Sequence, residues 1–169
     1  MKEPQITQKI SFQLLGCTYY GNPFHSAEEW TIENEVGKLW QRFMTLAGKY
    51  ASILSSISTN NNIGYEIHIE PEEYKTTKKY YVFVGVEVTN IKEVPLEMFV
   101  KILPETRYAN FTTKVHDKDS GAYIFKEWMP KKGYGQAYPY VIEAYDSRRF
   151  KGINDSESEI DWFIPVKKV

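Results

Sequence analysis

The 169-residue chain has a single cysteine, no long apolar run and almost no net charge. With Cys17 alone, the chain can form neither an internal disulfide nor a cysteine-rich zinc site, and we expect this residue to be a small buried hydrophobe. No stretch approaches the 18 or so apolar residues that a membrane-spanning helix requires, and the N-terminus MKEPQITQKISF lacks the apolar core of a signal peptide. We therefore expect a cytoplasmic protein that does not enter a membrane.

An excess of one charge sign is also lacking, because 21 basic and 22 acidic residues give a net charge of −1. These residues are interspersed and provide no basic surface for DNA or RNA, so we expect no direct nucleic-acid binding. There is no phosphate-binding loop, no dinucleotide fingerprint and no Gly-x-Ser-x-Gly elbow. The histidines His25, His68 and His116 show no spacing typical of metal ligands, and we expect neither a metal nor a cofactor.

Aromatic residues are abundant, since 13 Tyr, 9 Phe and 4 Trp make up 15% of the chain. Such side chains fill hydrophobic cores, and they also line pockets for flat or hydrophobic ligands. A chain of this length buries roughly 70% of its unfolded surface, so one domain needs no disulfide or metal to be stable. We predict a single domain over residues 1–169.

The second half of the chain repeats the pattern of the first. The segment LWQRFM (39–44) corresponds to IFKEWM (124–129), so that two bulky aromatic residues are exchanged between the copies. An extended run precedes each of these predicted helices and two strand-like runs follow it, at 10–20, 64–70 and 79–89 in the first half and at 99–115, 138–146 and 160–166 in the second. This order predicts two βαββ units, at about residues 6–90 and 97–166, related by a pseudo-two-fold axis.

The expected fold class is α+β. Strands and helices in this order, with hairpin-length connections, favour a mostly antiparallel sheet with the two main helices on one face, where they form a central ligand cleft. Thr31 can cap the first helix and Gly48 can end it. The second helix should begin near Asp119 or Ser120 and stop by Pro130, because proline cannot continue a helix.

One acidic residue has an unusual position in the strand predicted at residues 138–146. Alternation places Val141, Glu143 and Tyr145 on one face, and both faces are otherwise apolar. Glu143 therefore lies either at a solvent-exposed edge or in a hydrophobic cavity, where desolvation would raise its pKa.

The duplication should bring a second polar group near Glu143. Counting along the repeat, its counterpart is His68 or, after a shift of two residues, Glu66 or Glu70. The matched aromatic pairs of the two helices have two interpretations, as plain core or as the walls of a cleft between the helices. These pairs are Trp40 with Phe125 and Phe43 with Trp128.

Six short motifs occur in a fixed order along nearly the whole chain: LWQRF (39–43), YVFVGVEV (81–88), LPETRYANF (103–111), WMP (128–130) with GY (133–134), EAYD (143–146), and EI (159–160) with IPV (164–166). This pattern resembles the GyrI-like, AraC-type effector-binding domains of multidrug-responsive transcription regulators and of stand-alone proteins. Unlike those regulators, the chain has no helix-turn-helix segment before its first strand. We therefore expect a stand-alone member, in which transcriptional control would require a partner that binds DNA.

The resemblance implies a central pocket that accepts hydrophobic, often cationic aromatic compounds, with a glutamate matching Glu143 at its floor. An apolar cage excludes hydrophilic ions, aromatic faces attract positive charge, and the carboxylate neutralises it. The residues expected to contact the ligand are Glu143, Tyr145, Trp40, Phe43, Tyr108, Phe125 and Trp128.

Two other functions are compatible with the resemblance. In a hydrolase of strained small electrophiles, Glu143 would act as a general base on water, with Tyr108 or Tyr145 donating a proton or hydrogen bond. In a protein-binding inhibitor of a DNA topoisomerase, the surface would act instead of the pocket.

Overall fold

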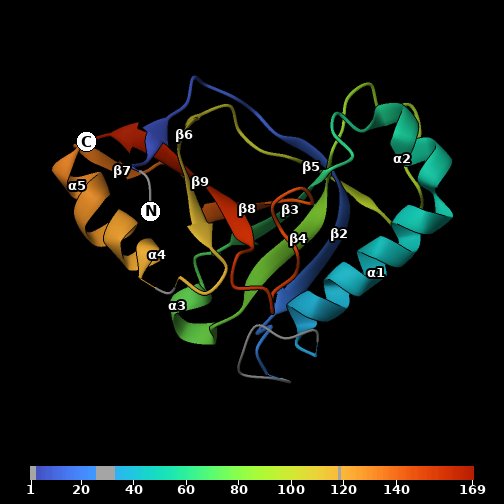
Figure 1. The fold of residues 1–169 in the computed structure, drawn as a ribbon, viewed down its shortest axis with the longest axis horizontal. Coiled ribbons are helices and arrows are strands. Elements are labelled where there is room, and N and C mark those ends of the chain that lie inside the picture. Colours follow the sequence, from blue (N-terminus) through green and yellow to red (C-terminus); the bar gives the residue numbers. More distant parts are fainter. Residues whose placement is uncertain (1–2, 26–32, 118) are drawn as a thin grey trace.

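The computed structural model describes residues 3–25, 33–117 and 119–169. One antiparallel sheet forms its centre, and none of the helices in these residues is long and apolar enough to cross a membrane. The elements, in chain order, are β1 (Gln5–Ile6), β2 (Gln13–Gly21), α1 (Glu35–Lys49), α2 (Ala51–Ile57), β3 (Ile63–Ile69), α3 (Tyr74–Thr77), β4 (Tyr80–Glu87), β5 (Phe99–Ile102), β6 (Arg107–Lys114), α4 (Ser120–Tyr123), the π-helix η1 (Ile124–Trp128), α5 (Met129–Lys131), β7 (Tyr134–Gln136), β8 (Tyr140–Asp146) and β9 (Glu159–Lys168) (Figure 1).

The order of the strands shows the duplication directly. Among the described residues, nine strands form the sheet in the order β1-β6-β9-β8-β3-β4-β2-β5, with β7 paired to β9. The first unit is β2-α1-β3-β4, and the second is β6, the helices α4, η1 and α5, then β8 and β9. The series β6-β9-β8 repeats β2-β4-β3 in reverse, so the pseudo-two-fold axis passes between β8 and β3. The predicted α+β fold with two βαββ units is confirmed.

The main helices of the two units pack on the same face of the sheet (Figure 1). In the first unit, α1 buries its apolar residues against β2 and β4, and its Trp40 hydrogen-bonds Glu66 of β3. In the second unit, η1 packs against β6 and β9, in a cluster that also contacts Trp162. Trp162 is the register partner of Glu143, which is itself paired with Glu66 across β3 and β8. Residues that face α1 and residues that face η1 therefore share one side of the sheet.

A separate aromatic core fills the other side of the sheet and includes Phe12, Tyr65 and Tyr108. At one end of the sheet β1 pairs with β6, and at the other end β2 pairs with β5. Between these two ladders, Ile10 forms a bridge with Thr106. The chain thus links the two ends of the sheet, and residues from both units share this core.

The helix ends differ from the sequence prediction in two places. Asn34 caps α1, since its side chain accepts a hydrogen bond from Gly37 N, whereas Thr31 lies outside the described residues. Gly48 does not end α1, because the helix runs to Lys49 and the N–H of Tyr50 closes it on Leu46 O.

Pro130 does not stop the second helical segment, which continues through α5 to Lys131. In η1 the N–H of Met129 donates to Ile124 O, five residues back, and this wider turn makes room for a proline. Pro130 then stands at the start of α5, where a missing N–H is tolerated.

Candidate functional site

Two buried carboxylates face each other at the pseudo-two-fold axis. Glu66 of β3 and Glu143 of β8 are direct register partners, and they are 1% and 4% exposed. Among the counterparts that the repeat allows for Glu143, the structure thus selects Glu66. Two carboxylates at such a position are costly to ionise together, because water is excluded and their charges repel.

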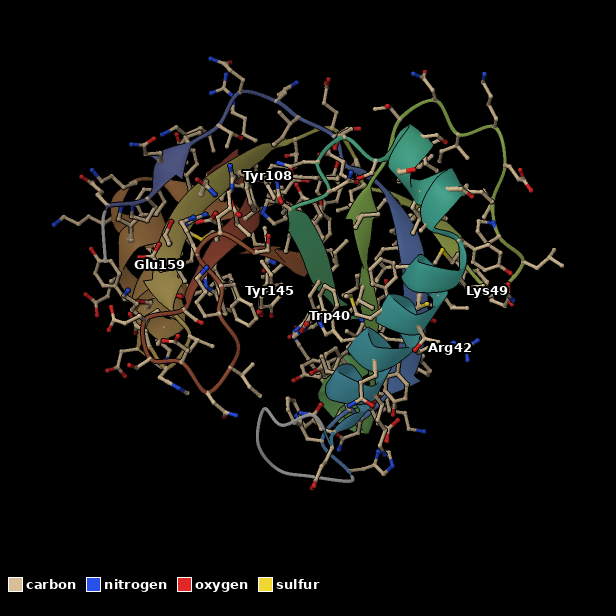
Figure 2. The ribbon with its side chains drawn as sticks, turned by 45° about the vertical axis from the view of Figure 1, so that its right-hand side comes forward. Trp40, Arg42, Lys49, Tyr108, Tyr145 and Glu159 are labelled. Atoms are coloured by element: carbon tan, nitrogen blue, oxygen red, sulfur yellow. The ribbon has the colours of Figure 1, made fainter. Side chains whose placement is uncertain are left out.

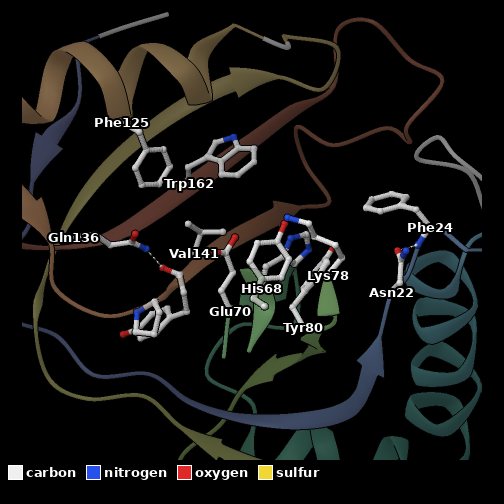
Figure 3. Close-up of a pocket in the computed structure, with 13 residues that line it drawn as sticks. Asn22, Phe24, His68, Glu70, Lys78, Tyr80, Phe125, Gln136, Val141 and Trp162 are labelled. Carbon is white, nitrogen blue, oxygen red and sulfur yellow. Dashed lines mark hydrogen bonds between the residues drawn. The ribbon is translucent and has the colours of Figure 1, made fainter. Parts of the chain in front are cut away.

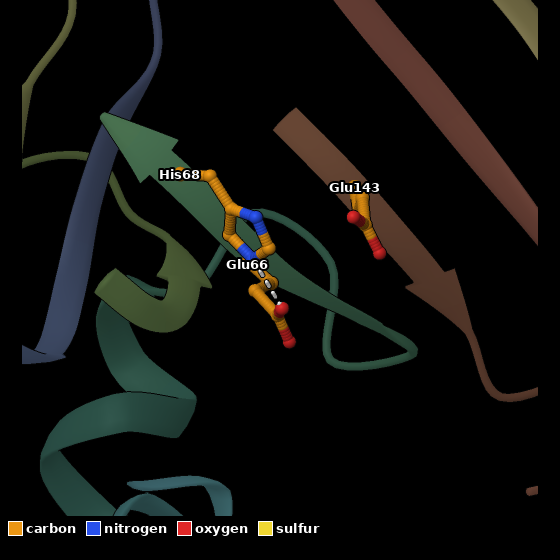
Figure 4. Close-up of side chains that lie close together, drawn as sticks. All are labelled: Glu66, His68 and Glu143. Atoms are coloured by element: carbon orange, nitrogen blue, oxygen red, sulfur yellow. Dashed lines mark hydrogen bonds and ion pairs between the residues drawn. The ribbon is translucent and has the colours of Figure 1, made fainter. Parts of the chain in front are cut away.

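Each carboxylate is hydrogen-bonded to the residue two positions later on its own strand, which strand alternation places on the same face. His68 Nε2 lies 2.6 Å from Glu66 Oε1 (Figure 4). The Tyr145 hydroxyl donates to Glu143 Oε2 at 2.6 Å. Tyr145 also approaches Glu66 Oε2, at 3.4 Å, and Trp40 Nε1 donates to the same oxygen at 2.6 Å. The two halves repeat one arrangement, with histidine in one copy and tyrosine in the other.

The electrostatics of the cluster follow from burial and from these contacts. Burial raises the pKa of Glu143 to about 7, and the negative charge of Glu66 adds to this effect, against the lowering by His68 and Tyr145. Burial alone would lower the pKa of His68, but its hydrogen bond to Glu66 and the nearby acidic charges outweigh it and raise the pKa. Burial also raises the pKa of the Tyr145 hydroxyl well above its usual range, so this group acts as a donor.

Trp40 covers the carboxylates from α1. Its ring meets Tyr145 edge to face, with centroids 5.6 Å apart, and both residues are labelled in Figure 2. Gly64 on β3 makes this position available, because a Cβ there would lie 2.8 Å from Cη2 of the Trp40 ring.

A cavity of about 570 Å³ adjoins the cluster at His68, which is one of its lining residues (Figure 3). Six of its lining residues are aromatic: Phe24, Tyr74, Tyr80, Phe125, Tyr140 and Trp162. His68 lines the cavity and contacts Glu66, so it connects the aromatic space to the buried acids.

The structure brings only some of the residues predicted from the sequence into this region. Glu143, Tyr145 and Trp40 meet at the carboxylate cluster, and Phe125, which is 41% exposed, lines the cavity.

The other three predicted wall residues lie elsewhere. Phe43 and Trp128 are 2% and 5% exposed in the cores beneath their helices, so the core interpretation holds for them. Tyr108 is fully buried on the opposite side of the sheet and hydrogen-bonds the Tyr140 hydroxyl at 2.8 Å. Alternation along β6 turns Tyr108 away from Glu143, so it neither lines the site nor donates a proton there.

Glu66, His68 and Trp162 are not among the site residues predicted from the sequence. Glu66 and His68 alternate along β3 as Glu143 and Tyr145 do along β8, and the repeat alone contains that signal. Spacing along the chain gives no sign of a metal site, because Glu143 joins Glu66 and His68 from a neighbouring strand. Ligand atoms of these three residues lie within 4.8 Å of one another.

Comparison with known proteins places the chain among effector-binding domains. The Cass2 family, described as integron-associated effector binding protein, matches residues 5–166. The transcriptional regulator BrlR of Pseudomonas aeruginosa is 27% identical over 96% of the chain, which spans 54% of that relative's length.

Solved structures share the fold at low sequence identity. SAV2435 bound to tetraphenylphosphonium has a TM-score of 0.63 and 14% identity, with 98% of this chain and 94% of that chain covered. A hydrolase encoded by lin2189 from Listeria innocua has a TM-score of 0.57 and 11% identity, with 98% and 92% covered.

Proposed function

Because the chain belongs to the Cass2 family of integron-associated effector-binding proteins, we propose that it binds hydrophobic aromatic cations in the cavity beside Glu66 and Glu143. The observation that carries this proposal is the buried carboxylate pair next to an aromatic-lined space. In the described part of the chain, no lysine or arginine forms an ion pair with either carboxylate. Of the described residues, His68 can offer a positive charge to Glu66, so a bound cation can supply the charge that Glu143 lacks.

The chemistry of the cavity favours organic cations over hydrated ions. Aromatic faces attract positive charge and apolar surface disfavours well-hydrated ions, so a large cation loses less on entering than a small one. The lining also contains one charged residue of each sign, Lys78 and Glu70. The ligand named for the similar fold of SAV2435, tetraphenylphosphonium, has this chemistry. Within the cavity, Trp162 and Phe125 provide aromatic surface, and His68 marks the side nearest the acids.

Glu143→Gln tests the proposal, because it removes one charge and keeps the shape of the side chain. We expect tetraphenylphosphonium to bind about 30-fold more weakly or worse, which corresponds to roughly 2 kcal/mol for a buried charge that loses its partner. Triphenylphosphine oxide, a neutral probe of related shape, should bind both proteins equally. Tryptophan fluorescence gives both affinities, and Glu72→Gln, on an exposed carboxylate, is the matched control.

Thermal unfolding provides a second measurement on the unaltered protein. A ligand that binds only the folded state stabilises it by about 2.7 kcal/mol at 100 times its dissociation constant. A panel of lipophilic cations that changes neither the melting temperature nor the fluorescence would refute the proposal, as would a Glu143→Gln protein with unaltered cation selectivity.

Hydrolysis of a strained electrophile is a second candidate, favoured by the contact of the Glu143 carboxylate with the Tyr145 hydroxyl at 2.6 Å. Glu143 would accept a proton from the attacking water as the C–O bond of the electrophile breaks. The Tyr145 hydroxyl, turned away from Glu143, would donate its proton to the released oxygen and recover one from Glu143 afterwards. In that case Glu143→Gln should lower the turnover of an epoxide substrate by about 10²–10⁴-fold while its binding survives. If the unaltered protein binds cations but does not turn over the epoxide, hydrolysis is refuted and binding remains as the function.

A further inference from the structure

Three metal-ligating side chains converge at the pseudo-two-fold axis. Glu66 and His68 project from one face of β3, and Glu143 projects from β8 on the same face (Figure 4). One potential ligand atom from each lies within 4.8 Å of the other two. The group arises from tertiary structure, since the two acids are 77 positions apart in the chain.

We propose that Glu66, His68 and Glu143 bind one divalent transition-metal ion of the Zn²⁺ type. One imidazole nitrogen and two carboxylate oxygens form a mixed donor set that suits Zn²⁺ and its neighbours better than Mg²⁺ or Ca²⁺, which prefer oxygen alone. Three protein ligands leave a fourth position for water or another small ligand. This inference does not depend on the proposed binding of organic cations, although it uses the same two carboxylates.

The present distances require only small movements. His68 Nε2 and Glu66 Oε1 are 2.6 Å apart. In a tetrahedral site with ligand distances of about 2.0–2.1 Å, two donor atoms lie roughly 3.3 Å apart. For an ion to replace this hydrogen bond, these two atoms need to move apart by less than about 1 Å, and Glu143 needs to move closer to them.

One oxygen of each carboxylate, Oε2, already accepts a hydrogen bond that holds it in place. Trp40 Nε1 donates to Glu66 Oε2, and the Tyr145 hydroxyl donates to Glu143 Oε2. Hydrogen bonds of this kind orient metal-binding carboxylates and are a regular part of metal sites. The remaining oxygen of each carboxylate is Oε1, and that of Glu66 already contacts His68.

Burial and charge favour an occupant of positive charge. Buried carboxylates are normally paired with cations or bound to metals. The side chain of Glu66 is 2% exposed and that of His68 is 15% exposed, so an ion would be shielded from water yet reachable from the His68 side. That side opens on the cavity, which provides a route of entry.

The test uses untagged protein that has been treated with a chelator and exchanged into metal-free buffer. Titration calorimetry with Zn²⁺ should show one ion per chain, and Co²⁺ should give the visible absorption of a four- or five-coordinate site. His68→Gln should weaken Zn²⁺ binding by at least about 100-fold, because even the loss of an outer partner costs 10–100-fold. His116→Gln, on an exposed histidine outside the cluster, should leave the affinity unchanged.

The outcomes separate clearly. The proposal is overturned if the protein binds no Zn²⁺, if binding survives His68→Gln, or if Co²⁺ gives only an octahedral spectrum like that of the free ion. Because any single variant could unfold, the Co²⁺ spectrum of the unaltered protein stands as an independent readout. Tetraphenylphosphonium binding to the same metal-free sample tests the proposed function separately, and saturating Zn²⁺ should weaken it by competition at the carboxylates.

Discussion

At the scale of single residues, the site consists of two buried carboxylates and the side chains that hydrogen-bond them. Glu66 receives hydrogen bonds from Trp40 and contacts His68, whereas Glu143 is held by Tyr145. Histidine can carry a charge near neutral pH and tyrosine cannot. The pseudo-symmetric site is therefore electrostatically asymmetric, with the positive group on the side of Glu66 and the cavity.

Trp40→Phe tests how much the indole donor contributes. The ring is largely retained, but a buried carboxylate oxygen of Glu66 loses its closest donor and keeps the longer contact with Tyr145, so we expect the free energy of unfolding to fall by about 1–3 kcal/mol. Urea unfolding measures the change. Trp162→Phe is the matched comparison, since its indole donates to the neutral hydroxyl of Thr113, and it should cost about 0.5–1.5 kcal/mol. An equal or larger loss for Trp162→Phe would contradict the special role of Trp40.

Asp146, at the end of β8, gives a prediction for pH. Hydrogen bonds from the Arg148 side chain and backbone lower its pKa from 3.8 to about 2. A carboxyl whose pKa is lowered by folding stabilises the folded state above its unfolded pKa and loses that contribution as the pH falls through the folded pKa. Asp146→Asn should therefore lower the melting temperature at pH 7, and the difference from the unaltered protein should shrink between about pH 4 and pH 2.

The control for this pH series is Asp119→Asn. Asp119 is exposed and its side chain forms no cap hydrogen bond, so its substitution changes the net charge alone. If the melting temperatures of Asp146→Asn and the unaltered protein differ by a constant amount down to pH 2, Arg148 does not act through the charge of Asp146.

At the scale of elements, the fit of α1 over β3 positions the site. Gly64 lies under the Trp40 ring, where any side chain would collide with it. Gly64→Ala should therefore displace the ring from Glu66, alter the tryptophan fluorescence and weaken cation binding. Binding titration and fluorescence of the variant provide the measurement.

Gly48→Ala is the matched control on the same helix-and-strand unit. A Cβ at Gly48 would meet nothing within 4 Å, and the residue lies inside α1. Replacing a helical glycine by alanine typically stabilises by up to about 1 kcal/mol, so this variant should melt at a slightly higher temperature and bind ligand unchanged. Similar binding by both variants would show that the contact of Gly64 with Trp40 does not matter.

At the scale of the whole molecule, the two units depend on each other. β3 and β8 join them through seven register pairs, and the core behind the sheet combines Phe12 and Tyr65 with Tyr108 and Tyr140. Neither half can bury its share of that core alone.

Separate fragments of residues 1–96 and 97–169 should thus be largely unfolded, and mixing them should restore structure. Circular dichroism and the dispersion of amide NMR signals would show both results. A single fragment that unfolds cooperatively by itself would contradict this interdependence.

The sequence by itself determined the fold class and the duplication, and it distinguished Glu143 from the other residues of its strand. These features rest on local patterns: the period of strand residues, the repeated aromatic helix motif, and one acid in an apolar strand. Local patterns also predict the face of the sheet on which a strand residue lies. Tyr145 lies beside Glu143, as alternation predicts.

Only the tertiary structure decided which residues meet. Glu66 was one of several counterparts until the register of β3 and β8 paired it with Glu143. Tyr108 and Glu143 both belong to the motifs of the family resemblance, yet alternation along β6, in the register set by its ladder with β9, turns Tyr108 to the opposite side of the sheet. Pro130 was expected to end its helix, but a π-turn accommodated it. Register, strand order and helix geometry depend on the packing of distant segments, and these long-range contacts leave little trace in the local sequence.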